Sequence, residues 1–153
     1  MLQKLNTRHA GFTLVEIMIV VAIIALLAAI AVPNFLRSRK RSQATQILED
    51  LRQLDSAIDQ YAIEFNKSGP TAKFLFSDLT KYVKTGTRLY SALTADPTGV
   101  LANDLLGHNF GSGFFIDTVD SMGSPRLYVH PVTFTALSDV APVAFWSPWV
   151  IAP

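Results

Sequence analysis

The sequence predicts an α+β fold, in which a long N-terminal helix packs on a small C-terminal antiparallel β-sheet. Residues 12–32 form a run of 21 residues without Lys, Arg, Asp, Pro or Gly, and helical periodicity continues from there to about Asn66. The last third of the chain instead holds short stretches rich in β-branched and aromatic residues, separated by Gly, Ser, Pro and Asp. The chain has no cysteine, which excludes disulfides and cysteine-bound metals. Its formal net charge is +1, which gives no reason to expect a nucleic-acid partner.

The apolar run is long enough to cross a membrane, since 21 residues of helix span roughly 30 Å, the thickness of a bilayer core. Residues 1–11 before it carry Lys4 and Arg8 and no acidic residue, the layout of an export signal with a cytoplasmic basic end. A secretory signal cut at Ala29-Ile30-Ala31 and a plain single-pass anchor are the alternatives. The run exceeds the usual apolar core of a secretory signal, about 7–15 residues, and Glu16 within it disfavours that alternative further.

The cations that follow the apolar run do not fix the orientation of the span. Counted alone, they outnumber the two on the near side and mildly favour the reverse topology. They would contact anionic lipid headgroups, or they would pair with acidic residues of adjacent subunits such as Glu49 or Asp50; the sequence leaves both open. These four cations are Arg37, Arg39, Lys40 and Arg41.

The stretch "GFTLVEIMIVVAIIALLAAIAVP", from Gly11 to Pro33, resembles the N-terminus of type IV pilins and of type II secretion pseudopilins. The resemblance rests on a Gly followed by Phe-Thr-Leu, a Glu four residues after the Phe, and an unbroken apolar helix that closes at a Pro. One position departs from many members of the family, because Ala25 stands where they have Gly.

The resemblance implies a sequence of processing events. Prepilin peptidase would remove residues 1–11 as a leader by cutting between Gly11 and Phe12, and would then methylate the amino group of Phe12. Residues 12–33 would anchor the chain in the bacterial inner membrane, with the C-terminal part in the periplasm. The subunit would then join a filament of its own kind, with help from an inner-membrane assembly platform and minor pseudopilins.

Glu16 is predicted to set the register of such a filament. A charge within a bilayer needs a partner, and Glu16 lies four residues from Phe12, about 6 Å along a helix. In a bundle of apolar helices it would neutralise the amine of Phe12 on a neighbouring subunit. Such a pair would fix the register, because a one-residue slip would leave both charges unpaired. The alternative is a carboxylate that is merely tolerated near the membrane surface.

Residues 34–69 are predicted to continue the helix as an amphipathic stalk. Pro33 is expected to kink or locally melt the helix rather than end it, because apolar periodicity resumes beyond it. Asn66, Gly69 and Pro70 supply the stop signals. The predicted apolar face consists of Ala44, Ile47, Leu48, Leu51, Leu54, Ile58, Tyr61, Ala62 and Phe65.

Residues 70–153 are predicted to form a globular head packed on that face. We expect a short helix within 72–86, a second short helix or loop within 87–99 that closes on a turn at Asp96-Pro97, and a loop over 101–113. Three antiparallel strands follow, within 113–119, 125–137 and 142–151. Their aromatic residues are predicted to fill the core rather than to bind a ligand; they include Phe145, Trp146 and Trp149.

A second stretch, "DSMGSPRLYV", is similar to the D-x-W-G-x-P-x-x-Y segment of major pseudopilins. The matching residues are Asp120, Gly123, Pro125 and Tyr128, whereas Met122 stands where Trp is usual. Together with the lack of the Cys pair common in type IV pilins, this favours a pseudopilin of type II secretion. A type IV pilin for adhesion, motility or DNA uptake, and a membrane-anchored binding domain that never polymerises, are the alternatives.

The sequence predicts neither an enzyme nor a cofactor. The resemblance suggests a calcium ion in the loop over 135–146, but Asp139 is the only carboxylate there and Ca²⁺ takes 6–8 oxygens. Calcium in the head therefore stays an alternative that would depend on backbone carbonyls. His108 and His130 are isolated in the sequence and lack metal-ligand spacing, and no serine lies in a G-x-S-x-G motif.

Overall fold

The computed structural model describes residues 11–68, 73–111 and 126–151. The chain divides into two compact units, Met1–Ser38 and Arg39–Pro153. The helix α1, Leu14–Glu64, begins in the first unit and ends in the second. The predicted helix to about Asn66 is confirmed, and Pro33 lies inside α1 without ending it.

In the first unit, every described residue of α1 is exposed. Within the described part of the chain, α1 is also the one helix long and apolar enough to cross a membrane. Its apolar side chains have no protein neighbours to cover them, since Leu14 is 75% exposed and Leu26 is 66% exposed. A soluble protein rarely shows such a surface, so this segment requires a lipid or protein environment.

The second unit is built on the remaining part of α1. Apolar residues at three- and four-residue steps place one face of the helix in the core, as the periodicity predicts. Phe65 lies beyond the end of the helix, is 47% exposed and packs against Tyr61 with ring centroids 4.7 Å apart. The residues of α1 that are buried are Ala44, Ile47, Leu48, Leu51, Leu54, Ala57, Ile58 and Tyr61.

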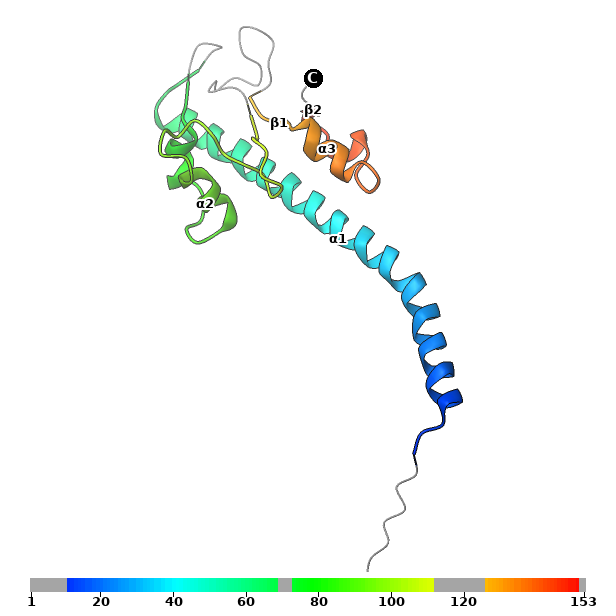
Figure 1. Ribbon diagram of the computed structural model, residues 1–153. Coiled ribbons are helices and arrows are strands. Elements are labelled where there is room, and N and C mark those ends of the chain that lie inside the picture. Colours follow the sequence, from blue (N-terminus) through cyan, green and yellow to red (C-terminus); the bar gives the residue numbers. More distant parts are fainter. Residues whose placement is uncertain (1–10, 69–72, 112–125, 152–153) are drawn as a thin grey trace, which may run out of the picture. The chain divides into compact units, whose positions relative to one another are not determined.

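Two short helices follow in the second unit, as expected from the sequence. The 3₁₀ helix η1 covers Phe76–Lys81 and buries Phe76 and Leu79, and α2 covers Arg88–Thr94 and buries Leu89 and Leu93. The hydroxyl of Thr87 accepts a hydrogen bond from the Tyr90 amide at 3.2 Å and so caps α2. All of these elements group along the carboxyl-terminal part of α1 (Figure 1).

The C-terminal segment contains strands β1, Tyr128–Val129, and β2, Val150–Ile151, with helices α3, Pro131–Leu137, and η2, Val143–Trp146, between them. The α+β class is confirmed, but the two strands pair in parallel rather than antiparallel, with Tyr128 opposite Val150. The chain needs a crossover to make a parallel pair, and α3 with η2 provides it. The predicted strand over 113–119 lies outside the described residues.

The helix α3 also corrects the strand predicted over 125–137. Its residues are β-branched and aromatic, but Pro131 occupies the first helical turn, where a missing N–H costs nothing. The Nδ1 atom of His130 accepts a hydrogen bond from the Val132 amide at 3.2 Å and caps the helix. Similarly, η2 replaces part of the strand predicted over 142–151, and its last residue, Trp146, is fully buried.

Candidate functional site

The Gly11-Phe12 bond, the predicted cleavage point, lies just before the first turn of α1. A Cβ atom built on Gly11 would meet nothing within 4 Å, and the side chain of Phe12 is 83% exposed. The bond is therefore not covered by any described part of the chain.

Glu16 closes a capping box with Thr13 at the start of α1. The backbone amide and the hydroxyl of Thr13 each donate to Oε2 of Glu16 at 2.8 Å, and the Glu16 amide donates to the Thr13 hydroxyl at 3.2 Å. This arrangement satisfies two of the amides that every helix start leaves without partners. It also places the carboxylate at the positive end of the helix dipole, where negative charge is favourable.

The two hydrogen bonds that the Glu16 carboxylate accepts both go to one of its oxygens, Oε2. Within the described residues, the other oxygen, Oε1, has no hydrogen-bond partner. Glu16 is thus held in place by its own chain and still offers an acceptor to a second group. The part played by Thr13 was not predicted, although the Thr-x-x-Glu spacing of "TLVE" is the sequence signal of a capping box.

The second unit uses its acidic residues for internal ion pairs. Asp50 binds the guanidinium of Arg88, and Glu49 lies 3.7 Å from Arg52 within α1. These were the residues expected to meet the basic cluster of an adjacent subunit, and the structure gives both a partner in the same chain. Burial lowers the pKa of Arg88, and the charge of nearby Asp104 opposes that shift.

His108 and His130, which lie apart in the sequence, are stacked in the structure with ring centroids 4.8 Å apart. His108 contacts the hydroxyl of Thr133 through Nδ1 at 2.8 Å, and that hydroxyl donates to the buried carboxylate of Asp104 at 2.5 Å. Asp104 also accepts from the amides of Leu106 and His108. The network fastens the loop before Gly111 to α3, and the described residues hold no group of three metal-binding side chains.

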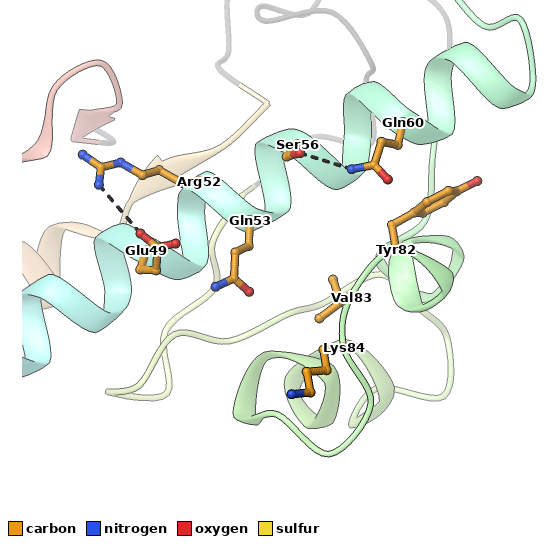
Figure 2. Close-up of a pocket in the computed structure, with 8 residues that line it drawn as sticks. All are labelled: Glu49, Arg52, Gln53, Ser56, Gln60, Tyr82, Val83 and Lys84. Atoms are coloured by element: carbon orange, nitrogen blue, oxygen red, sulfur yellow. Dashed lines mark hydrogen bonds and ion pairs between the residues drawn. The ribbon is translucent and has the colours of Figure 1, made fainter.

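An open groove lies beside the exposed face of α1 in the second unit (Figure 2). Its volume is about 290 Å³. Gln60 donates to the hydroxyl of Ser56 at 3.2 Å along its floor. Its polar groups are amides, hydroxyls and exposed charges. The residues that line it are Glu49, Arg52, Gln53, Ser56, Gln60, Tyr82, Val83 and Lys84.

The remaining predicted residues of the second unit have structural positions. Tyr128 lies in β1, and burial raises the pKa of its phenol. Asp139 pairs with Lys40 at 3.1 Å, which occupies the one carboxylate of the loop considered for calcium. The aromatic residues fit the predicted core role, since Trp146 is fully buried and Phe145 and Trp149 pack against it or its neighbours. Asp120, Gly123 and Pro125 lie outside the described residues.

Comparison with known proteins places this motif in a family. Residues 6–32 match the model of the prokaryotic N-terminal methylation motif. The chain is 34% identical over 99 residues to the type II secretion system core protein G of Pectobacterium carotovorum, an alignment that covers 60% of this chain and 64% of that protein. It is 31% identical over 102 residues to the core protein G of Vibrio cholerae, covering 63% and 70%.

Pilus proteins match as well. The chain is 33% identical over 110 residues to the type IV wide pilus major component PilA4 of Thermus thermophilus, an alignment that covers 72% of this chain and 82% of that protein. Several other relatives are matched over only 24% to 50% of their own length, and the chain spans less than two thirds of the Pectobacterium protein. No solved structure matches the chain significantly. Its N-terminal motif and these relatives show that the chain belongs to the type IV pilin-like family, which includes the pseudopilins of type II secretion.

Proposed function

We propose that the protein is a major pseudopilin, a structural subunit of a periplasmic filament of a type II secretion system. Prepilin peptidase cleaves it after Gly11 and methylates Phe12, and the chain is held in the inner membrane by residues 12–33 until it enters the filament. The observation that carries the proposal is the exposed apolar part of α1, which has Glu16 in its first turn and is preceded directly by Phe12 and Thr13. The relatives named core protein G support secretion as the process served.

Assembly follows from the chemistry of the exposed helix. Apolar side chains that face lipid in the membrane face neighbouring subunits in the filament, so extraction needs no exposure to water. The oxygen Oε1 of Glu16, which the capping box leaves without a partner in the described chain, accepts from the amine of Phe12 on the next subunit. The protein therefore acts by assembly and not by catalysis.

Mass spectrometry of the membrane-extracted protein, with N-terminal sequencing, tests the processing. We expect a chain that begins at methylated Phe12 when prepilin peptidase is present, and a chain that keeps its leader when the peptidase is absent. The variant Gly11→Val is expected to keep the leader in both backgrounds. A chain that retains Met1 in the presence of the peptidase would contradict the proposal, and a chain that begins at Val32 would identify a secreted domain instead.

A type IV pilin is the second candidate, because the alignment with the Thermus PilA4 protein covers more of both chains than those with the core protein G relatives. Electron microscopy of cells that express the chain separates the two. Long surface filaments indicate a pilin, whereas filaments confined to the periplasm indicate a pseudopilin. The third candidate is an anchored domain that never polymerises, and unchanged function of the Glu16→Ala variant would favour it.

A further inference from the structure

The carboxylates of the described chain are all engaged within the chain itself. Each accepts at least one hydrogen bond or ion pair from a neighbouring group, through side chains in most cases and through the Leu75 amide in that of Asp78. These ten residues are Glu16, Glu49, Asp50, Asp55, Asp59, Glu64, Asp78, Asp96, Asp104 and Asp139. The described carboxylates therefore have partners within the chain before any other molecule binds.

The cations next to the apolar segment are not engaged in this way. Arg37, Arg39 and Arg41 are exposed, and none of them forms an ion pair with a described residue, whereas Lys40 binds Asp139 at 3.1 Å. All three arginines lie within five residues of Leu36, the last apolar residue of the segment. Three guanidinium groups are thus left without an anion from the described residues at the end of the apolar run.

The positions of Arg39 and Arg41 around the helix indicate what kind of anion they meet. Residues two apart in an α-helix point about 200° apart, so Arg39 and Arg41 lie on nearly opposite sides of α1. One protein neighbour contacts one side of a helix, but lipid headgroups surround a helix that crosses a bilayer. Guanidinium also binds phosphate through two parallel N–H donors, which suits a phosphodiester better than an already engaged carboxylate.

We propose that Arg39 and Arg41 bind the phosphates of anionic phospholipids at the membrane surface where α1 leaves the bilayer. The inference rests on the proposed function only in requiring that residues 12–33 span the membrane. These contacts hold the subunit at a fixed depth before assembly, and they are broken when it is extracted. Because they lie on the side to which the second unit is exported, they also account for a basic cluster that the positive-inside rule disfavours there.

Native mass spectrometry of the full chain in non-ionic detergent, titrated with phosphatidylglycerol or phosphatidylcholine, tests this inference. A cation near an anionic lipid surface contributes about fivefold in affinity, so Arg39→Gln with Arg41→Gln is expected to weaken phosphatidylglycerol binding about 25-fold. Binding of phosphatidylcholine should not change. Replacement of both by lysine keeps the charges and should restore most of the affinity.

The matched control is Lys81→Gln with Lys84→Gln. These two exposed lysines of the second unit also form no ion pair with a described residue, but they lie far from the apolar segment in the sequence. This control should bind phosphatidylglycerol as the wild type does. Equal losses in the two double variants would overturn the inference, because the effect would then be one of net charge.

Other outcomes would also overturn the inference, and extraction with alkaline carbonate separates its failure from the failure of the proposed function. If inorganic phosphate displaces phosphatidylglycerol completely, the arginines serve a soluble anion. If the double glutamine variant keeps its lipid and loses self-association in the same detergent, they serve a second copy of the chain. Release of the wild-type chain from membranes by alkaline carbonate would contradict the span itself, whereas an embedded chain without lipid preference would contradict the inference alone.

Discussion

Arg126 shows how much one buried charge contributes to the second unit. Its side chain is 9% exposed and donates from Nε to Asp55 at 3.0 Å and from Nη2 to Asp59 at 3.1 Å, with a second bond to Asp55. The two aspartates lie on α1, so the arginine joins the start of the C-terminal segment to the helix. Asp55 and Asp59 are 39% and 61% exposed, so they keep part of their hydration.

We expect Arg126→Met to lower the free energy of unfolding by about 1.5–3 kcal/mol, the value of hydrogen bonds to charged groups. The loss stays below that of a fully buried ion pair because water can solvate both aspartates again. Thermal unfolding of the full chain in detergent, followed by tryptophan fluorescence, measures it. The control Arg52→Met removes an exposed pair and should change stability by less than about 0.5 kcal/mol, and equal effects of the two variants would contradict this account.

Some residues of the N-terminal site could be predicted from the sequence, and others could not. Glu16 was conspicuous because a charge in an apolar run needs a reason, and its position relative to Phe12 gave one. Thr13 carries no charge, so the composition of the run did not draw attention to it, and only the hydrogen bonds reveal how it holds Glu16. Arg126 lies in the segment similar to major pseudopilins, but its partners are 67 and 71 residues away in the sequence, beyond the reach of any local pattern.

The turn after α2 is organised by Asp96. Its carboxylate accepts from the hydroxyl of Thr98, from the amide of Thr98 at 3.0 Å, and from the amides of Val100 and Leu101. The hydrogen bond from the Thr98 side chain, and then that from the Thr98 amide, lower the pKa of Asp96, while the amides of Leu101 and Val100 add to the effect. Gly99 follows with φ of +69°, a conformation that favours glycine.

Thr98→Val is therefore expected to raise the pKa of Asp96 toward its ordinary value of 3.8. In the wild type this carboxylate stabilises the fold fully above the ordinary pKa, and the contribution is lost as the pH falls through the lowered pKa. The variant should lose that contribution at a higher pH. Carboxyl chemical shifts recorded by NMR during an acid titration measure the difference, and an unchanged midpoint for Asp96 would show that the backbone amides alone set its pKa.

Elements in which apolar residues recur at regular steps were predicted better than elements that depend on packing against residues distant in the sequence. The long helix α1 has apolar residues at regular steps over many turns, and its extent was predicted to within about two residues. By contrast, the seven residues of α3 have strand-like composition, and their helix depends on Pro131 and on a cap by His130, which is not among the usual capping residues. Strand direction depends on that crossover and could not be read from the strands themselves.

We expect the second unit to fold when it is separated from the first. All described residues of the buried core lie between Ala44 and Trp146, and none of the described residues 11–38 belongs to it. A fragment of residues 39–153 should therefore be soluble without detergent and keep the near-ultraviolet circular dichroism of the full chain. A fragment of residues 50–153 is the control, since it lacks Ala44, Ile47 and Leu48 and should unfold at lower temperature. Aggregation of the longer fragment would contradict the division into units.

The place of α1 at the beginning of the second unit has a consequence for the order of synthesis. Eight buried residues of α1 leave the ribosome before most of the residues that cover them, because the rest of the core lies between Phe74 and Trp146. At typical elongation rates this interval lasts roughly 4 to 17 seconds. During that time the nascent chain presents an uncovered apolar stripe beside the membrane. If the chain is exported as proposed, chaperones and proteases at the site of export meet the subunit first as a bare amphipathic helix, and only later as a folded protein.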